Sequence, residues 1–399
     1  MQKTKIGFWY QQKRVLKFIC ALLICGLSAC QKDTQTPEIS GDLRLQPVSF
    51  SNLPDWNNED FAAVIPVFAK NCSQIQKSKN AYFSADVIQI KATDLQEKCK
   101  KFTAKNIKTA AEMKKFMEAE FKPYAISDST NADGKFTSYY EAVIRASYNK
   151  SGKYKYPVYG KPSDLIEINL RDFDAELPNT RLVGRVENGK FIPYYNRRDI
   201  ENNGVQAPVL MWGDDLVDIH FMQIQGSAVA QMDDGSQVRI GFADSNGHKF
   251  KGIGSILIAK GYIKSGDSSM PKIREWLRAN PDKAEDLMRE NDRFIFQRIT
   301  NADGPVGAFG ISLTAGRSMA VDTRYIPLGS MLWLDTTGPD KRSIRKIVFA
   351  QDIGSAIKGV VRGDYFWGHG EEALKYAGKM NSAGKYYIIV PKETVLKAN

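Results

Sequence analysis

Two aspartates in the last third of the chain have the spacing and surroundings expected of interacting carboxyl groups. Residues 345–351 predict a strand that delivers Asp352 at its end. Asp364 follows after a loop that contains Gly354 and Gly359. Glycine permits a positive φ, so this loop can turn tightly and return Asp364 towards Asp352. Two close carboxyls in partly apolar surroundings raise the pKa of one of them. A carboxylic acid that stays protonated near neutral pH is suited to cleaving a glycosidic bond.

A second interpretation of these aspartates involves no chemistry. Aspartate beside glycine commonly accepts hydrogen bonds from backbone N–H groups in turns. On these residues alone we favour the turn interpretation, and further matches along the sequence are needed to decide.

The elements that must position these residues are mainly strands. Residues 55–121 predict helices, with Met113, Phe116 and Met117 at helical intervals. After residue 136 the pattern predicts strands, punctuated by turn signals such as Asn188-Gly189. Two helices are predicted from about residue 271 and over 281–290, followed by further strands to residue 391. The expected fold class is therefore mainly β with some α.

The N-terminus predicts export and lipid anchoring. Five basic residues precede an apolar run over residues 18–29, too short to span a bilayer and typical of a secretory signal. Leu27-Ser28-Ala29-Cys30 resembles a lipobox, in which the thiol of Cys30 takes a diacylglyceryl group. Residues 30–50 are then a tether. Gln31 favours the outer membrane, facing the periplasm, by analogy with bacterial lipoproteins. The alternatives are an ordinary signal peptide and an uncleaved anchor.

Cysteine and histidine usage argues against a metal site. Once the signal is removed and Cys30 is lipidated, Cys72 and Cys99 remain, and an oxidising compartment favours a disulfide between them. Two separate buried thiols are the alternative. The three histidines are far apart in the sequence and no ligand spacing occurs, so we expect no metal.

The charge balance is mildly basic. The formal net charge of +11 becomes +6 when the first 30 residues, with five bases and no acid, are removed. This suits loose association with an anionic polymer or lipid surface. No basic run interleaved with aromatic residues is present, so we do not expect nucleic-acid binding.

Longer sequence matches decide between the two interpretations of the aspartates. Residues 320–391 resemble the three-aspartate (3D) domain that ends members of the membrane-bound lytic transglycosylase A (MltA) family. Four upstream segments also resemble that family: residues 136–142 (FTSYYEA), 222–227 (MQIQGS), 243–248 (ADSNGH) and 316–322 (GRSMAVD). Ser138 and Ala142 depart from the usual glycine and proline, which affects the expected backbone there.

The resemblance implies two domains separated by a substrate groove. The first is a double-psi β-barrel built from residues 51–141 and 290–399. The second is a smaller β-barrel, residues 142–289, inserted into the first.

It also implies the chemistry. Lytic transglycosylases cleave the β-1,4 bond between N-acetylmuramic acid and N-acetylglucosamine in the glycan strands of peptidoglycan and leave a 1,6-anhydro end. The family position of the single acid and base matches Asp364, and Asp352 is expected to tune its pKa. No cofactor is implied. The residues expected to bind substrate are Thr137, Tyr139, Tyr140, Gln223, Gln225, Ser227 and Asp322. Of these, Asp322 is expected to hold either the loop or the substrate.

Two rival functions remain open at this point. A wall-directed glycoside hydrolase would use Asp352 or Asp322 as a second carboxylate. A non-catalytic lipoprotein would only tie the membrane to peptidoglycan. All three aspartates are present in the sequence, which weighs against the second rival.

Overall fold

The computed structural model describes residues 43–129 and 133–396. The predicted signal peptide, Cys30 and most of the tether lie outside these ranges. The described chain is mainly β with helices, which confirms the predicted fold class. Within these ranges, no helix combines the length and the apolar character that crossing a membrane requires.

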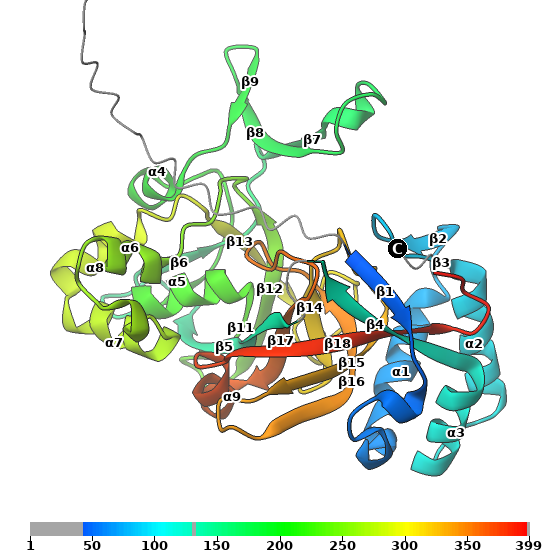
Figure 1. The fold of residues 1–399 in the computed structure, drawn as a ribbon. Coiled ribbons are helices and arrows are strands. Elements are labelled where there is room, and N and C mark those ends of the chain that lie inside the picture. The colour runs from blue at the N-terminus through cyan, green and yellow to red at the C-terminus, as the bar shows by residue number, and fades with distance from the viewer. Residues whose placement is uncertain (1–42, 130–132, 397–399) are drawn as a thin grey trace, which may run out of the picture. The chain divides into compact units, whose positions relative to one another are not determined.

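Thirteen strands of the described residues form one hydrogen-bonded network (Figure 1). Their order along the main path is β1 (Leu43–Pro47), β4 (Phe121–Asp128), β18 (Asn381–Pro391), β15 (Met331–Thr337), β16 (Ser343–Asp352), β14 (Ser318–Val321), β17 (Arg362–His369), β5 (Gly134–Ser147), β11 (Ser227–Met232), β12 (Gln237–Ser245) and β13 (Ile295–Thr300). Two strands lie off this path, β10 (Val209–Gly213), which pairs with β5, and β6 (Tyr156–Tyr159), which pairs with β10.

The long strand β5 joins two groups of strands. Its first half, up to Glu141, runs parallel to β17. Its second half, from Ala142, runs parallel to β11. One continuous strand therefore belongs both to the group that carries the aspartates and to the group formed by the middle of the sequence. The two closed barrels and the groove between them stay a prediction.

Three helices pack together beside β4 and β18 (Figure 1). Asp60 caps α1 (Phe61–Ile75) by accepting from the N–H of Ala63, and Thr109 begins α3 (Ala110–Glu120) with a capping box. The helical prediction for residues 55–121 is wrong in one place. A hairpin of β2 (Tyr82–Ser84) and β3 (Gln89–Lys91) separates α1 from α2 (Ala92–Ala104).

A disulfide joins two of these helices. Cys72 on α1 and Cys99 on α2 are bonded, with their Cα atoms 5.4 Å apart. The rings of Phe68, Phe102 and Phe116 meet beside it, with centroids 4.9–5.9 Å apart. The cross-link therefore lies in a packed apolar cluster.

The middle of the chain holds most of the other helices. The predicted pair is present as α7 (Met270–Ala279) and α8 (Pro281–Met288). The sequence patterns did not predict α4 (Arg197–Asn203), α5 (Leu216–Gln225), α6 (Ile253–Ala259) or α9 (Gly370–Ala377). Predicted strands nearby form a separate three-stranded sheet of β7 (Ile166–Asn169), β8 (Arg181–Glu187) and β9 (Lys190–Pro193).

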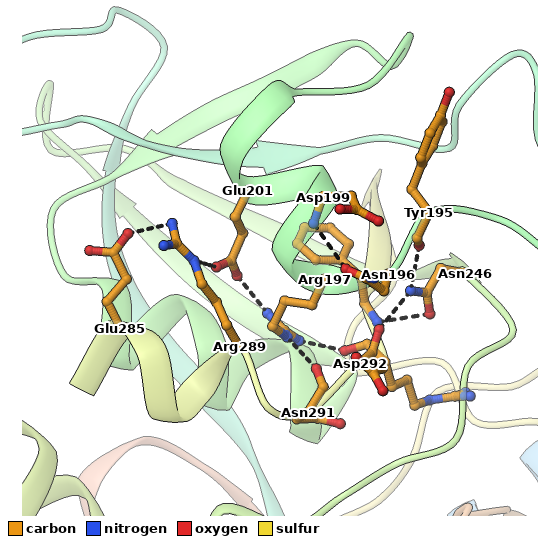
Figure 2. Close-up of polar contacts among 12 residues, drawn as sticks. Tyr195, Asn196, Arg197, Asp199, Glu201, Asn246, Glu285, Arg289, Asn291 and Asp292 are labelled. Atoms are coloured by element: carbon orange, nitrogen blue, oxygen red, sulfur yellow. Dashed lines mark hydrogen bonds and ion pairs between the residues drawn. The ribbon is translucent and has the colours of Figure 1, made fainter. Parts of the chain in front are cut away.

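A buried polar network ties loops of this middle segment together (Figure 2). The guanidinium of Arg197 pairs with the carboxylate of Glu201 at 3.0 Å. Asn246 donates from Nδ2 to the carbonyls of Tyr195 (2.9 Å) and Asp292 (2.8 Å). Asn246 belongs to the 243–248 motif, so in this structure that motif fixes backbone segments against each other.

Removing the disulfide should lower stability without changing the fold. A cross-link between residues 27 apart restricts the unfolded chain by roughly 3–4 kcal/mol in the chain-entropy model. The Cys72→Ala/Cys99→Ala variant is expected to lose up to about that much unfolding free energy in urea titrations. A reductant should destabilise the wild type and leave the variant unaffected. Two titratable thiols in the unreduced, denatured exported domain would contradict this.

Candidate active site

The short strand β14 lies between the two strands that carry the predicted carboxyl groups. Ala320 on β14 pairs with Asp352 of β16 on one side and with Asp364 of β17 on the other. The register between β14 and β16 shifts at Met319/Ala320, which is the kind of irregularity that re-aims a side chain beside a site. The two aspartates thus lie across one strand from each other.

Strand β5 contacts both carboxyl groups. Thr137 pairs directly with Asp364, and its hydroxyl donates to Asp364 Oδ1. Tyr139 lies two residues further along β5, so its side chain projects from the same face as Thr137. The hydroxyl of Tyr139 donates to Asp352 Oδ2 at 2.9 Å. The structure therefore brings four of the predicted site residues together.

The hydroxyl of Thr137 is oriented by an arginine. Arg362 Nη2 donates to Thr137 Oγ1 at 2.7 Å. Because a guanidinium can only donate, the Thr137 oxygen accepts from Arg362 and its hydrogen is directed at Asp364. Burial raises the pKa of Asp364, while the Thr137 hydrogen bond and the charge of Arg362 oppose that rise. Among the described residues no hydrogen bond reaches Asp364 Oδ2, which leaves that oxygen available to carry a proton.

Asp352 has different surroundings. Oδ1 accepts from the N–H of Ala308 at 3.1 Å, and Oδ2 accepts from Tyr139. Burial raises the pKa of Asp352 to about 6, against the opposing hydrogen bonds, and the nearby charge of Asp364 raises it further. Both oxygens of Asp352 act as acceptors, an arrangement that stabilises the carboxylate form. The two carboxyls therefore differ in opposite ways: Asp352 has more hydrogen-bond donors, yet the pKa rise to about 6 is that of Asp352.

Aromatic rings lie against this pair. Tyr139 and Phe366 are 5.1 Å apart between ring centroids, and Phe366 is buried. The pKa of Tyr139 is raised well above its usual value by burial first and by the charge of Asp352 second. Tyr139 therefore stays protonated and remains a hydrogen-bond donor to Asp352.

Asp322 holds the loop that contains Gly354 and Gly359 and does not face the carboxyl pair. It is 1% exposed and accepts from the N–H of Gly359 at 2.9 Å and from Arg324 at 2.7 Å. Burial would raise the pKa of Asp322, but the bonds from Arg324 and Gly359 hold it below its usual value. Its burial rules out direct sugar contact in this conformation.

The two glycines of this loop differ. Gly359 has the expected positive φ of 131°, whereas Gly354 does not. A Cβ on Gly354 would lie 2.6 Å from Ile357 Cγ1.

The other predicted glycan contacts lie on the insert side of β5. Tyr140 is 3% exposed and its hydroxyl accepts from Arg274 at 3.1 Å. Gln225 accepts from the N–H of Tyr140 at 3.2 Å. Gln223 and Ser227 are buried. These four residues are not brought to the carboxyl pair, because alternation along β5 points Tyr140 away from the face of Thr137 and Tyr139.

Arg362 and Phe366 lie on either side of Asp364 in the sequence, and the sequence analysis gave Arg362 no role. They flank Asp364 at two-residue spacing on β17, so the alternation of a strand places all three side chains on one face. That period was present in the sequence. The contact between Arg362 and Thr137 could not be read from it, because Thr137 belongs to a distant strand.

Comparisons with known proteins identify the family of this chain. The chain matches the family models described as "MltA specific insert domain" over residues 135–298 and "3D domain" over residues 317–390. It is similar to the crystal structure of MltA from Neisseria gonorrhoeae, with a TM-score of 0.77 and 30% identity, covering 90% of this chain and 95% of that one. The chain belongs to the MltA family.

Other relatives are less similar in sequence. A membrane-bound lytic murein transglycosylase from Agrobacterium tumefaciens superposes with a TM-score of 0.77 at 28% identity, covering 88% of this chain and 98% of that one. The membrane-bound lytic murein transglycosylase A of Escherichia coli strain K12 is 29% identical over 262 residues. That alignment spans 64% of this chain and 65% of the E. coli protein. The named relatives are thus lytic murein transglycosylases.

Replacing Thr137 tests whether its hydroxyl orients the acid. Thr137→Val keeps the shape but removes a hydrogen bond to a charged group, so kcat/KM on murein should fall roughly tenfold to hundredfold. Loss of that bond should raise the pKa of Asp364 further, so Asp364 keeps its proton to higher pH and the alkaline limb of the pH–rate profile moves up. Thr137→Ser is the matched control and should retain most activity. Equal behaviour of the two variants would refute the assignment.

Proposed function

We propose that this chain is a lytic murein transglycosylase that uses Asp364 as its single acid and base. It cleaves the β-1,4 bond between N-acetylmuramic acid and N-acetylglucosamine and leaves 1,6-anhydro ends. The proposal rests on one observation, that the two carboxyl groups accept different numbers of hydrogen bonds. Asp364 has one oxygen without a protein donor among the described residues, whereas both oxygens of Asp352 accept hydrogen bonds.

The reaction needs two proton transfers at one carboxyl group. Asp364 Oδ2 gives its proton to the glycosidic oxygen as the bond to C1 breaks. The C6 hydroxyl of the same muramic acid residue attacks C1, and its proton passes to the Asp364 carboxylate. Because the nucleophile belongs to the substrate, little translational entropy is lost at this step. The protein has to hold the sugar and keep its acid protonated, and burial of Asp364 favours the protonated form.

The rival hydrolase fits this site less well. It requires a second carboxylate to act as nucleophile or to activate a water. Asp352 is the nearest candidate, but both of its oxygens are occupied by Tyr139 and Ala308. Asp322 is buried and bonded to Arg324. A purely binding protein would have no use for two carboxyls whose burial raises both pKa values.

Within this proposal the glycan lies in a groove between the barrel of residues 51–141 and 290–399 and the inserted barrel of residues 142–289. The partner change of β5 at Glu141/Ala142 supports that division. Thr137 and Tyr139 lie on the glycan side of β5. Gln225 is partly exposed, whereas Gln223 and Ser227 are buried, and their roles in glycan binding stay part of this proposal.

We further propose that the protein is anchored through lipidated Cys30 to the outer membrane and faces the periplasm. The lipobox Leu27–Cys30 supports this, and the relatives named above are called membrane-bound. Its partners are then the membrane lipid and the murein strand.

Asp364→Asn should abolish turnover while the protein still folds and binds glycan. An amide cannot donate the required proton, and general acid–base catalysis is worth roughly 10²–10⁴-fold. Because no second catalyst is proposed, the loss should reach the upper end of that range. Mass spectrometry of muropeptides released from purified sacculi would measure anhydro ends directly, and reducing ends would indicate the hydrolase.

Asp352→Asn serves as the comparison for that variant. It should retain more activity, and removing the neighbouring charge should lower the pKa of Asp364. Asp364 then loses its proton at lower pH, so the alkaline limb of the pH–rate profile moves down. If Asp364→Asn instead kept substantial anhydro-product formation and Asp352→Asn did not, the acid would be misassigned.

Cys30→Ala should release the protein from membranes. Without the thiol no diacylglyceryl group can be attached, so palmitate labelling should disappear and the protein should move to the soluble periplasmic fraction. Unchanged labelling and fractionation would contradict the anchor.

A further inference from the structure

A cavity of about 500 Å³ lies between helix α1 and the loop that precedes β14, apart from the carboxyl pair. Ala63, Pro66 and Val67 form one wall along a single face of α1. Ala315 and Gly316 form the opposite wall. These side chains are small or apolar, so the cavity can accept an aliphatic group.

The lining also includes two lysines, together with Asp60, Thr314 and Arg317. Lys70 lies on α1 and Lys346 on β16. Among the described residues no hydrogen bond or ion pair within 4 Å reaches the ammonium group of either one. Lys346 is partly buried, and its pKa is lowered by burial and then by the charge of Arg317. The charges of Glu59 and Asp60 oppose that lowering, but neither carboxylate forms an ion pair with the Lys346 ammonium, so an added anion would stabilise it.

The acids nearby are already engaged. Arg317 pairs with Glu59 at 2.8 Å. Asp60, the acid on the cavity wall, accepts from the N–H of Ala63 at 3.1 Å as the cap of α1. Lys70 and Lys346 are therefore the positively charged lining groups that make no ion pair among the described residues, and the Asp60 carboxylate lies in the same lining.

The loop on the far wall is bonded to the catalytic strand. Gly316 N–H donates to the carbonyl of Phe366 at 2.8 Å, and the Tyr365 hydroxyl donates to the carbonyl of Gly316 at 3.1 Å. Tyr365 and Phe366 follow Asp364 directly on β17. A ligand in the cavity would thus contact a loop that is held by the strand carrying the acid.

We propose that this cavity binds a carboxylate of the peptides that murein glycans carry, a proposal that rests on the function argued above. Lys70 and Lys346 would take the carboxylate, and the apolar walls would take the aliphatic part of the amino acid. A bare phosphate would meet the lysines but leave those walls uncovered. The enzyme would then recognise peptide-bearing glycan at a site distinct from the one that breaks the sugar bond.

Binding of the free stem tetrapeptide, released from murein by an amidase, tests this without any turnover. Calorimetry should show that the wild type binds it and that Lys70→Met and Lys346→Met each weaken binding roughly tenfold or more, as expected for loss of a charge-assisted bond. Lys77→Met, an exposed lysine just beyond α1, is the matched control and should bind normally. Amidation of the peptide carboxylates should abolish binding.

Stability separates a ligand site from a structural role. Lys346→Met removes an unpaired charge, so its Tm should stay level or rise while peptide binding falls. A large drop in Tm would instead make Lys346 structural and overturn the proposal. So would absence of peptide binding by the wild type, unchanged binding by both variants, or equally tight binding of inorganic phosphate.

A kinetic measurement then links the cavity to catalysis. The ratio of kcat/KM on peptide-bearing glycan to that on amidase-stripped glycan should exceed one for the wild type and for Lys77→Met, and fall towards one for Lys346→Met. An unchanged ratio would refute a role in substrate choice. If the wild type turned over neither glycan, the proposed function would fail, while the calorimetry would still decide on the cavity.

Discussion

The parallel pairing of β5 with β17 is the interaction on which the site depends. It places Thr137 opposite Asp364, two residues that are 227 positions apart in the chain. Without this register Arg362 has no hydroxyl to orient and Asp364 Oδ1 has no donor. The same strand carries Tyr139 to Asp352, so one register sets the surroundings of both carboxyls.

Unequal hydrogen bonding then separates two chemically identical groups. Burial raises the pKa of both aspartates, which by itself would not distinguish an acid from a charged neighbour. Asp352 accepts at both oxygens and Asp364 at one. Since hydrogen bonds donated to a carboxylate favour its charged form, the less satisfied group is the one better able to hold a proton. The proposed division of roles rests on how many donors the fold supplies to each oxygen.

The surrounding structure keeps this arrangement in place. Asp322 holds the loop at Gly359 from inside the protein, and the disulfide joins helices α1 and α2. The partly buried Lys346 is an exception in a structure where most buried charges are paired, as Arg317 is with Glu59.

The sequence by itself determined the family and predicted the chemistry-bearing residues. The strand ending at Asp352, the match of Asp364 to the family acid and the lone pair Cys72 and Cys99 were all readable from local pattern and motif. The mainly β class followed from strand periodicity. These features depend on neighbours in the chain, which the sequence lists in order. Helix α9 and the hairpin of β2 and β3 escaped because short elements carry weak periodic signals and depend on tertiary contacts.

Tertiary structure alone decided which motif residues share the site. Tyr139 and Tyr140 are adjacent in one motif, yet alternation along β5 sends the first to Asp352 and the second to Arg274 in the interior. Asp322 belongs to the aspartate motif but is buried under its own loop. Arg362 gained its role from Thr137, a residue of a distant strand. Pairing between strands far apart in the chain sets these contacts, and no local pattern encodes that register.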